Sequence, residues 1–268
     1  ALLDLLKFPD IASKRFVFRQ YDQQVQTQTA IKAGKGDAAV LAPAGCSRGI
    51  SVKIDGNARY VFAHPRRGGR LAVAEAARNV ACTGALPVAA TDGLNYGNPQ
   101  QPHVYWQFSE SVFGIAEAAE ALGTPVVSGN VSFYNESELG EVLPTPLIGV
   151  LGVIEDPSKS VGIAPRAGDA LVSISIDLSE DPHGFLGASA YAYAIHGVES
   201  GYPADTNLEQ EAALAKFLVK AADSNLINAA HDVSDGGAAV ALAEMAMESG
   251  VGLTAELAGN GGAVANLF

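Results

Sequence analysis

The clearest periodic pattern of apolar residues lies between Tyr105 and Leu122. Apolar positions there follow one another at alternating steps of four and three residues, and the glutamates fall on other faces. This spacing belongs to one face of an α-helix, so we expect an amphipathic helix. An Ala-rich helix is expected over residues 71–82, and its Glu75 and Arg78, three residues apart, are expected to form an ion pair.

Short β-rich runs separated by Gly-containing turns predict strands around these two helices. We expect the last two of them to be buried and the fourth to continue into Thr91-Asp92. The predicted strands are 39–41, 50–54, 60–62, 87–90, 125–127 and 145–154.

Residues 156–168 contain two prolines and two glycines, which is typical of a linker. The alternation then restarts, with predicted strands at 170–176, 226–230 and 251–257 and predicted helices at 187–196, 208–223 and 235–249. Strands alternating with helices predict a mixed α/β and α+β protein of two domains, 1–157 and 158–268. We expect the second domain to stop before its last element is complete.

Composition narrows the class of protein. A hydrophobic share of 48% excludes intrinsic disorder. The 29 acidic against 17 basic residues give a charge of −12, which disfavours binding to nucleic acid or to an anionic membrane surface. No apolar run approaches the ~20 residues that span a bilayer, no leader is evident, and two cysteines make no disulfide framework. These features predict a cytoplasmic protein.

The first candidate for chemistry is the segment from Thr91 to Pro99. Asp92 ends an apolar run and is followed by a series of Gly and Asn residues. We expect a turn at the carboxyl edge of a sheet, where ligands of open α/β sheets bind. A plain turn is the alternative, because Gly and Asn also serve turns that bind nothing.

The second candidate is the segment from Val126 to Glu136. Gly129 would let the backbone approach a phosphate, and Asn130 can ligate Mg²⁺ through its amide oxygen. The hydroxyl of Ser132 can both donate to and accept from a substrate. The alternative is a Gly-containing bulge within a strand.

The third candidate is a loop between a predicted strand and a predicted helix. Its polar residues suit helix N-caps, and two glycines at a helix start leave N–H groups free for an anion. No second His or Cys lies at the spacing of a zinc ligand. The residues of this loop are His231, Asp232, Ser234, Asp235, Gly236 and Gly237.

At these segments the chain resembles phosphoribosylformylglycinamidine synthase, in particular the second half of its large synthetase subunit. The resemblance implies the fold of aminoimidazole ribonucleotide synthetase (PurM-like). In that fold an N-terminal α/β domain pairs its sheet with a counterpart and is followed by a C-terminal α+β domain, here as one half of an internally duplicated enzyme. The matching segments are 11–15, 20–22, 55–60, 74–80, 91–99, 128–136, 144–146 and 230–237.

The resemblance also implies an activity, which is the ATP-dependent amidation of formylglycinamide ribonucleotide in the fourth step of purine biosynthesis. The ammonia comes from glutamine. The implied cofactors are ATP and Mg²⁺. The implied partners are a glutaminase subunit, a small accessory subunit and the first half of the same polypeptide.

Residue by residue, the resemblance implies that Asp92 and Gly129 contact ATP, that Asn130 binds Mg²⁺ and that Ser132 contacts the ribonucleotide. It leaves the loop from His231 to Gly237 as a possible anion or nucleotide site. It assigns no catalytic residue here, because the catalytic histidines of the family belong to the first half. We therefore expect the chain to be inactive alone.

Two other functions stay open. One is a sister ATP-dependent synthetase of the same superfamily. The other is a non-catalytic half that binds a structural nucleotide, which would be favoured by nucleotide at the third candidate loop and none at Gly129-Asn130.

Overall fold

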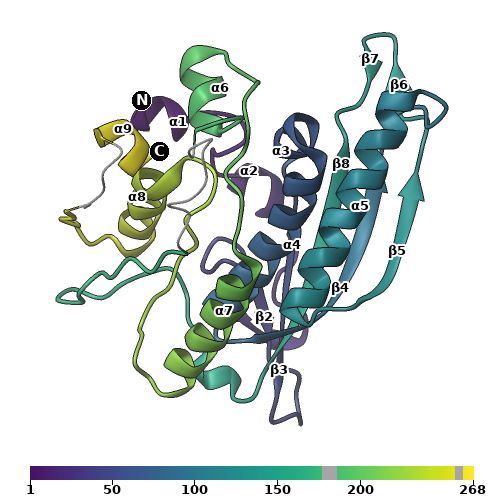
Figure 1. Ribbon diagram of the computed structural model, residues 1–268. Helices are drawn as coiled ribbons and strands as arrows, with labels where there is room; N and C mark the ends of the chain where they lie inside the picture. The colour runs from purple at the N-terminus through teal and green to yellow at the C-terminus, as the bar shows by residue number, and fades with distance from the viewer. Residues whose placement is uncertain (177–185, 257–261) are drawn as a thin grey trace.

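A computed structural model describes residues 1–176, 186–256 and 262–268 (Figure 1). The part up to residue 154 supplies all the strands of the described residues and five helices: α1 (Leu2–Leu5), α2 (Arg15–Phe18), β1 (Thr29–Ile31), β2 (Ala39–Leu41), β3 (Gly49–Asp55), α3 (Ala58–Ala63), α4 (Pro65–Cys82), β4 (Leu86–Asn95), α5 (Pro102–Leu122), β5 (Val126–Ser132), β6 (Glu136–Ser137), β7 (Gly140–Glu141) and β8 (Thr145–Ile154). The later part supplies α6 (Ala190–His196), α7 (Leu208–Asp223), α8 (Gly237–Ser249) and α9 (Gly262–Leu267). Short 3-10 turns lie at Val25–Thr27 and Pro157–Lys159.

The main sheet has six strands in the order β1-β2-β3-β8-β4-β5, and β6 and β7 form a separate hairpin. Strands β4 and β5 are parallel, whereas every other neighbouring pair in the main sheet is antiparallel. The connection from β4 to β5 runs through α5, as a parallel pair requires. Because β5 is the last strand in this order, it lies at an edge of the sheet.

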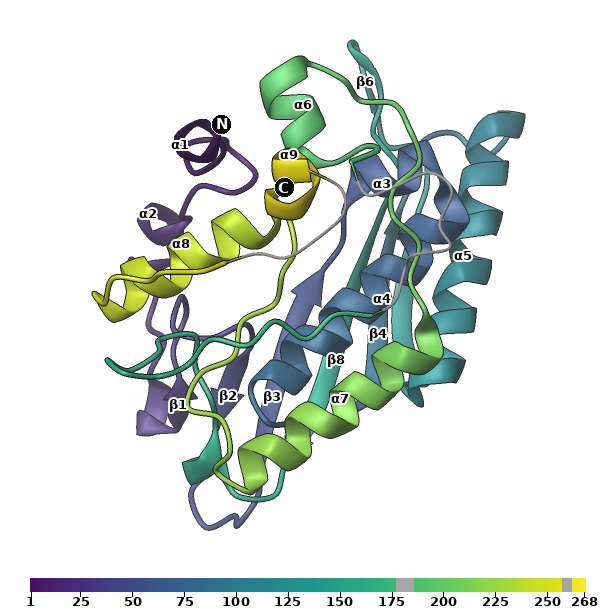
Figure 2. The same cartoon turned by 60° about the vertical axis from the view of Figure 1, so that its left-hand side comes forward.

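Helices α4 and α5 cover one face of this sheet, and α7 packs outside α4 (Figures 1 and 2). The core between them is built from small and branched side chains, with Val73 and Val80 of α4 against Ile148 and Val150 of β8. The opposite face carries exposed apolar side chains, among them Val52, Ile54, Leu147 and Leu151. In the described part of the chain no helix covers that face (Figure 2).

Two glycines bring α4 and α5 into close contact. A Cβ atom on Gly69 would overlap the carbonyl oxygen of Ser111, and a Cβ on Gly114 would overlap that of Arg66. The helix axes can approach this closely only because both side chains are absent.

We expect Gly114→Ala to destabilise the protein by about 1–3 kcal/mol, because overpacking outweighs the gain of about 1 kcal/mol in helix propensity. Thermal unfolding measures the change. Gly252→Ala is the matched control, since nothing lies within 4 Å of a Cβ built at Gly252. Equal melting temperatures for Gly114→Ala and the wild type would contradict the close contact.

Periodicity predicted the long helices well. The expected helix at 208–223 is α7, and those at 105–122 and 71–82 lie within α5 and α4. Helix α4 begins earlier than expected because Pro65 occupies its first turn and the His64 side chain accepts from the Arg67 N–H.

The prediction of a strand at residues 60–62 is wrong, because these residues lie in α3. The Asn57 side chain accepts from the N–H groups of Arg59 and Tyr60, and this N-cap outweighs the β-propensity of Tyr-Val-Phe. The expected burial of residues 125–127 is also wrong. Val126 and Val127 are 42% and 70% exposed, since β5 is an edge strand.

The strands predicted after residue 169 are not present in the described residues. Residues 170–176 and 251–256 form no strand, and Leu257 lies outside the described residues. Residues 226–230 make a single bridge, from Ala229 to Gly162. Val172 is 79% exposed, and this apolar run pairs with no strand among the described residues.

Candidate functional site

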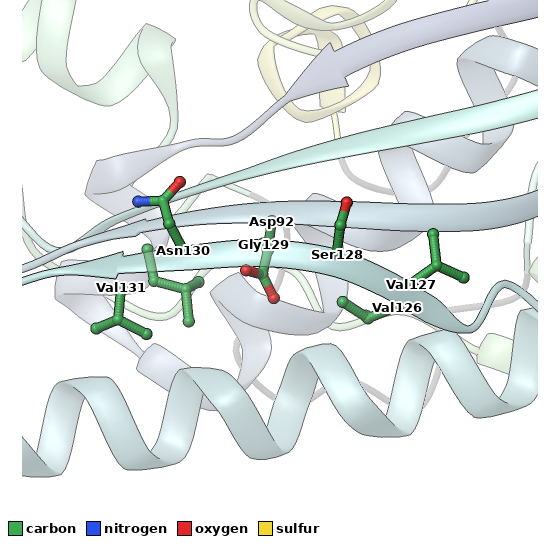
Figure 3. A pocket seen from close by; sticks show the side chains of 8 residues that line it. Asp92, Val126, Val127, Ser128, Gly129, Asn130 and Val131 are labelled. Atoms are coloured by element: carbon green, nitrogen blue, oxygen red, sulfur yellow. The ribbon is translucent and has the colours of Figure 1, made fainter.

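The first two candidate segments form one pocket at the β4–β5 edge, inside the strands rather than in turns after them. Asp92 pairs with Gly129 across the two parallel strands. The pocket is lined by Asp92, Leu94 and residues 126–131 (Figure 3). The expected turn at residues 91–99 therefore begins later, after β4 ends at Asn95.

Gly129 makes room for the Asp92 carboxylate. A Cβ on Gly129 would overlap Asp92 Oδ1. Burial raises the pKa of Asp92, and the nearby backbone N–H of Asn130 offsets part of this effect. A glycine is therefore required here for the sake of Asp92 itself.

Asn130 and Ser132 differ in their surroundings. The Asn130 side chain is exposed and points to the side of β5 opposite to Asp92 (Figure 3). Ser132 is partly buried, and its Oγ lies 3.3 Å from Oδ1 of Asn135, whose amide also donates to the carbonyl oxygen of Tyr96. The structure thus joins Ser132 to the turn after β4 and leaves Asn130 free to meet a ligand.

A second site lies where the sheet meets the C-terminal part of the chain. Asp55 ends β3, Glu75 and Asn79 lie one turn apart on α4, and Asp232 and Asp235 belong to the loop before α8. Asn79 Nδ2 donates to Asp55 Oδ2 at 3.0 Å. We call these five residues the acidic cluster.

The carboxyl groups of the acidic cluster are buried and raise one another's pKa values. Burial raises the pKa of Asp55 and that of Glu75, and for Glu75 the nearby Asp55, Asp232 and Asp235 raise it further. Lys53 and Arg78 act in the opposite direction. The buried Oδ2 of Asp232 has no hydrogen-bond partner among the described residues.

Arg78 does not form the predicted pair with Glu75. Its guanidinium instead bridges two acids of the C-terminal part, with Nε 2.5 Å from Asp232 Oδ1 and Nη1 2.5 Å from Glu211 Oε1. The carboxylates of Asp232 and Glu211 are each 2% exposed. Arg78 therefore links α4 to both α7 and the loop before α8.

The third candidate loop, residues 231–237, is held by hydrogen bonds and by its backbone conformation. Asp235 accepts from Asn57 Nδ2, and burial raises its pKa. Gly236 and Gly237 adopt positive φ angles of 89° and 71°. The side chains of the loop do not cap α8, whose N-cap is Gly236, so the N-cap interpretation is wrong. Ser234 is exposed, and its carbonyl oxygen accepts a hydrogen bond from the backbone N–H of Gly237.

His231 lies between two carboxylates. Its Nδ1 is 2.6 Å from Asp37 Oδ1 and its Nε2 is 2.9 Å from Glu244 Oε2. Burial lowers the pKa of His231, but the hydrogen bonds and charges of the two acids outweigh this effect and raise it to about 10. His231 is therefore an imidazolium at neutral pH.

The donor chemistry of the acidic cluster suits Mg²⁺, which prefers carboxylate and amide oxygens. The unpaired Oδ2 of Asp232 and the surplus of carboxylates support this fit. Among the described residues no three acidic, His or Cys side chains are gathered closely enough to form a complete metal site.

The structure keeps the pocket and the acidic cluster apart. Asp55 pairs with Ile148, and Ile148 pairs with Asp92, so the two acids share one face of the sheet. They are two strands, or about 10 Å, from each other. Ile148 is 1% exposed and fills the space between them.

Glu75→Gln is expected to stabilise the protein at neutral pH. The pKa of Glu75 is raised in the folded state, so the protonated carboxyl group favours folding at a pH below the pKa of the unfolded state. This stabilisation is lost as the pH rises through the pKa of the folded state, because the buried group then has to ionise. Each tenfold change in the acid dissociation constant of Glu75 on folding changes the free energy of unfolding by about 1.4 kcal/mol. Melting temperatures from pH 4 to 8 test this, with exposed Glu120→Gln as the control. No gain at pH 8 for Glu75→Gln would contradict the burial of a charged carboxylate.

No ligand-binding role was predicted for Asp55, Glu75 or Asn79, and Glu75 was expected only to pair with Arg78. A signal was available, since Glu75 and Asn79 are four residues apart and so lie on one face of a helix. Both occur in segments that carry the resemblance, as does Asp55. What the sequence could not show is that β3, α4 and the loop before α8 meet.

No helix in the described ranges is long and apolar enough to cross a membrane.

Comparison with known proteins assigns the two parts of the chain. Residues 35–154 match the N-terminal domain of AIR synthase related proteins, and residues 166–266 match the C-terminal domain. The PurL subunit of phosphoribosylformylglycinamidine synthase from Moorella thermoacetica is 47% identical over 96% of this chain. The subunit from Chlorobium luteolum is 48% identical over 91%. The chain spans about one third of the length of these relatives, 34% and 32% respectively.

Solved structures of PurL from Thermotoga maritima have the same fold. The one complexed with AMPPCP has a TM-score of 0.56 at 27% identity, over 80% of this chain and 31% of that one. The one complexed with FGAR gives the same TM-score and identity, over 80% and 30%. The expected PurM-like fold is therefore confirmed, and the chain belongs to the AIR synthase related family, among the PurL subunits of phosphoribosylformylglycinamidine synthase.

Proposed function

We propose that this chain contributes a nucleotide site to a phosphoribosylformylglycinamidine synthase, an ATP-dependent C–N ligase. The whole enzyme would amidate formylglycinamide ribonucleotide with ammonia derived from glutamine. The observation that carries the proposal is 47% identity to a PurL subunit over 96% of the chain. Ligands named for the related T. maritima structures, AMPPCP, ATP and FGAR, are compatible with it.

The acidic cluster would hold Mg²⁺ through Asp55, Glu75, Asn79 and Asp232. When bound, Mg²⁺ supplies positive charge that neutralises the phosphates of ATP and charge developing during transfer. A chain of net charge −12 needs such a cation to bind a nucleotide. The N–H of Gly236, at the N-cap of α8, would help bind a phosphate, whereas the N–H of Gly237 already donates to the carbonyl oxygen of Ser234.

The β4–β5 pocket would receive a different part of a ligand. The Asp92 carboxylate repels a bare phosphate but can accept from a ribose hydroxyl or an amino group. We retain Asp92 and the Gly129 backbone as contacts to ATP, Asn130 as a second possible Mg²⁺ ligand and Ser132 as a contact to the ribonucleotide.

A non-catalytic half that binds a structural nucleotide is the second candidate. It is favoured by the separation of the acidic cluster from the β4–β5 pocket, which buried Ile148 divides. Nucleotide bound only beside Asp232 would support it. Nucleotide in the β4–β5 pocket as well would support a catalytic half.

Further parts of the proposal concern the assembly. The partners would be a glutaminase subunit, a small accessory subunit and the other half of a duplicated polypeptide, and the compartment would be the cytoplasm. The chain tested alone should form no amidine. ADP release from ATP with ammonia and formylglycinamide ribonucleotide, by the full-length protein, tests the activity, and no product would contradict it.

Asn130→Ala and Ser132→Ala should affect the full-length enzyme differently. Loss of the Asn130 amide should raise the Mg²⁺ concentration needed for half-maximal turnover about tenfold, whereas Ser132→Ala should raise the KM for the ribonucleotide with little change in the Mg²⁺ requirement. Ser128→Ala is the control on the same strand, because its hydroxyl is already bonded to Thr91. Identical profiles for Asn130→Ala and Ser132→Ala would contradict both roles.

A further inference from the structure

An exposed surface at the start of α5 carries large apolar side chains that the proposed nucleotide sites do not use. Tyr105 and Trp106 of α5 are 59% and 54% exposed, and Leu139, between β6 and β7, is 100% exposed. His103 Nε2, in the first turn of α5, lies 2.6 Å from Glu141 Oε1 of β7. The hairpin and the start of α5 therefore form one surface (Figure 1).

Tyr134, on the segment that joins β5 to the hairpin, adds a third exposed aromatic ring. The residue is 59% exposed and has a φ of 59°, in the left-handed region that is unfavourable for a bulky side chain. Two backbone hydrogen bonds impose this conformation: Tyr134 N–H donates to Gly97, and Asn135 N–H donates to Tyr96. Backbone strain of this kind is common at functional sites, and here it holds a ring in solvent.

The same surface carries negative charge that the described residues do not neutralise. Glu136 and Glu141 are partners across the β6–β7 pair, although like charges in this position destabilise a hairpin. Glu136 and Glu138 form no ion pair with a cation in the described ranges. The sequence contains no Lys or Arg between Arg78 and Lys159. A ligand that covers this surface therefore has to bring positive charge with it.

We call this surface the hairpin patch, and its residues are Tyr105, Trp106, Tyr134, Glu136, Glu138 and Leu139. Exposed aromatic and apolar side chains close to charged ones are typical of protein–protein contacts. Nucleic acid and anionic membranes would be repelled by the glutamates. A symmetric contact between two copies would bring the same glutamates together, so it is disfavoured as well.

We propose that the hairpin patch docks a partner subunit of the same enzyme, which presents a basic and apolar surface to it. Leu139 and the aromatic rings would make the apolar contacts. Glu136 and Glu138 would pair with Lys or Arg side chains of the partner. This inference rests on the proposed function, in which the chain acts together with other subunits.

Calorimetric titration of the full-length protein with the purified glutaminase subunit, and separately with the purified accessory subunit, tests the proposal. ADP and glutamine, which are ligands of the proposed reaction, are present throughout. Leu139→Asp should weaken the binding of one subunit about tenfold or more. Glu138→Lys should weaken the same subunit at low salt, and the loss should shrink at high salt because the ion pairs are exposed.

The matched control is Glu120→Lys, at the other end of α5, where the side chain is also exposed. Its partner affinity should equal that of the wild type. Carbodiimide cross-linking, which joins carboxylates to amines, should connect Glu136 or Glu138 to a lysine of the bound subunit.

Tyr134→Asn separates docking from folding. Asparagine tolerates a positive φ better than tyrosine does, so the melting temperature should stay the same or rise. The affinity for the partner subunit should nevertheless fall about tenfold, because the ring is lost. A fall in melting temperature with unchanged affinity would show that Tyr134 has a structural role, and would overturn its place in the contact.

The outcomes also separate this inference from the function on which it rests. If neither subunit binds the wild type, the proposed assembly fails and the docking site fails with it. If a subunit binds the wild type, Leu139→Asp and Glu138→Lys equally well, only the docking site is overturned. A higher KM for the ribonucleotide in Leu139→Asp, with unchanged subunit binding, would show instead that the hairpin covers the substrate. A dimer of the wild type alone that Leu139→Asp abolishes in sedimentation would show that a second copy covers the patch.

Discussion

Replacing Arg78 with leucine is expected to destabilise the protein by about 3–5 kcal/mol, the cost of removing one partner from a buried ion pair. The guanidinium is the shared partner of Glu211 and Asp232, whose carboxylates are each 2% exposed. Without it, two buried carboxylates would face each other across the contact between α4 and the C-terminal part. Urea unfolding of Arg78→Leu and the wild type measures the difference.

The control for this variant is Arg48→Leu. Arg48 pairs with Glu155 at 2.8 Å, but the two side chains are 66% and 71% exposed. Such a surface pair is worth less than about 1 kcal/mol. Equal losses for the Arg78 and Arg48 variants would contradict the conclusion that Arg78 ties the two parts together.

Asp232→Asn is expected to weaken Mg²⁺-dependent ATP binding about a hundredfold or more, since it removes a charged ligand rather than a residue that only orients one. The substitution keeps the size of the side chain and the Asp37 contact to the backbone. Calorimetric titration of the full-length protein with ATP, at several Mg²⁺ concentrations, measures the loss.

Asp223→Asn is the matched control, because Asp223 pairs with Lys159 at the end of α7 and is 67% exposed. Its ATP affinity should equal that of the wild type. Unchanged affinity in Asp232→Asn would show that the acidic cluster does not bind the Mg²⁺ of the nucleotide.

The elements that sequence analysis predicted well are those whose pattern is local and long. Helices α5 and α7 span 21 and 16 residues, so their apolar periodicity repeats over several turns. Residues 60–62 were misjudged because a cap at Asn57 decides between helix and strand there. Residues 170–176 were misjudged because a strand also needs a neighbour, which a local pattern does not reveal.

The candidate site shows the same limit. The composition of the loop from His231 to Gly237 marked it as unusual, and the resemblance pointed to Asp92 and Gly129. The partners of that loop, Asp55 on β3 and Glu75 on α4, are more than 150 residues away in sequence. Only the packing of the C-terminal part against α4 brings these charges together.

The central claim is that the acidic cluster between the two parts of this chain binds the metal of a nucleotide. Anomalous X-ray scattering from crystals of the full-length protein, grown with Mn²⁺ and a non-hydrolysable ATP analogue, tests it most directly. We predict a Mn²⁺ peak in contact with Asp232 and with Asp55 or Glu75, and phosphates of the analogue beside Gly236 and Gly237. A nucleotide bound with its Mn²⁺ at Asn130 alone, and none at the acidic cluster, would contradict the claim.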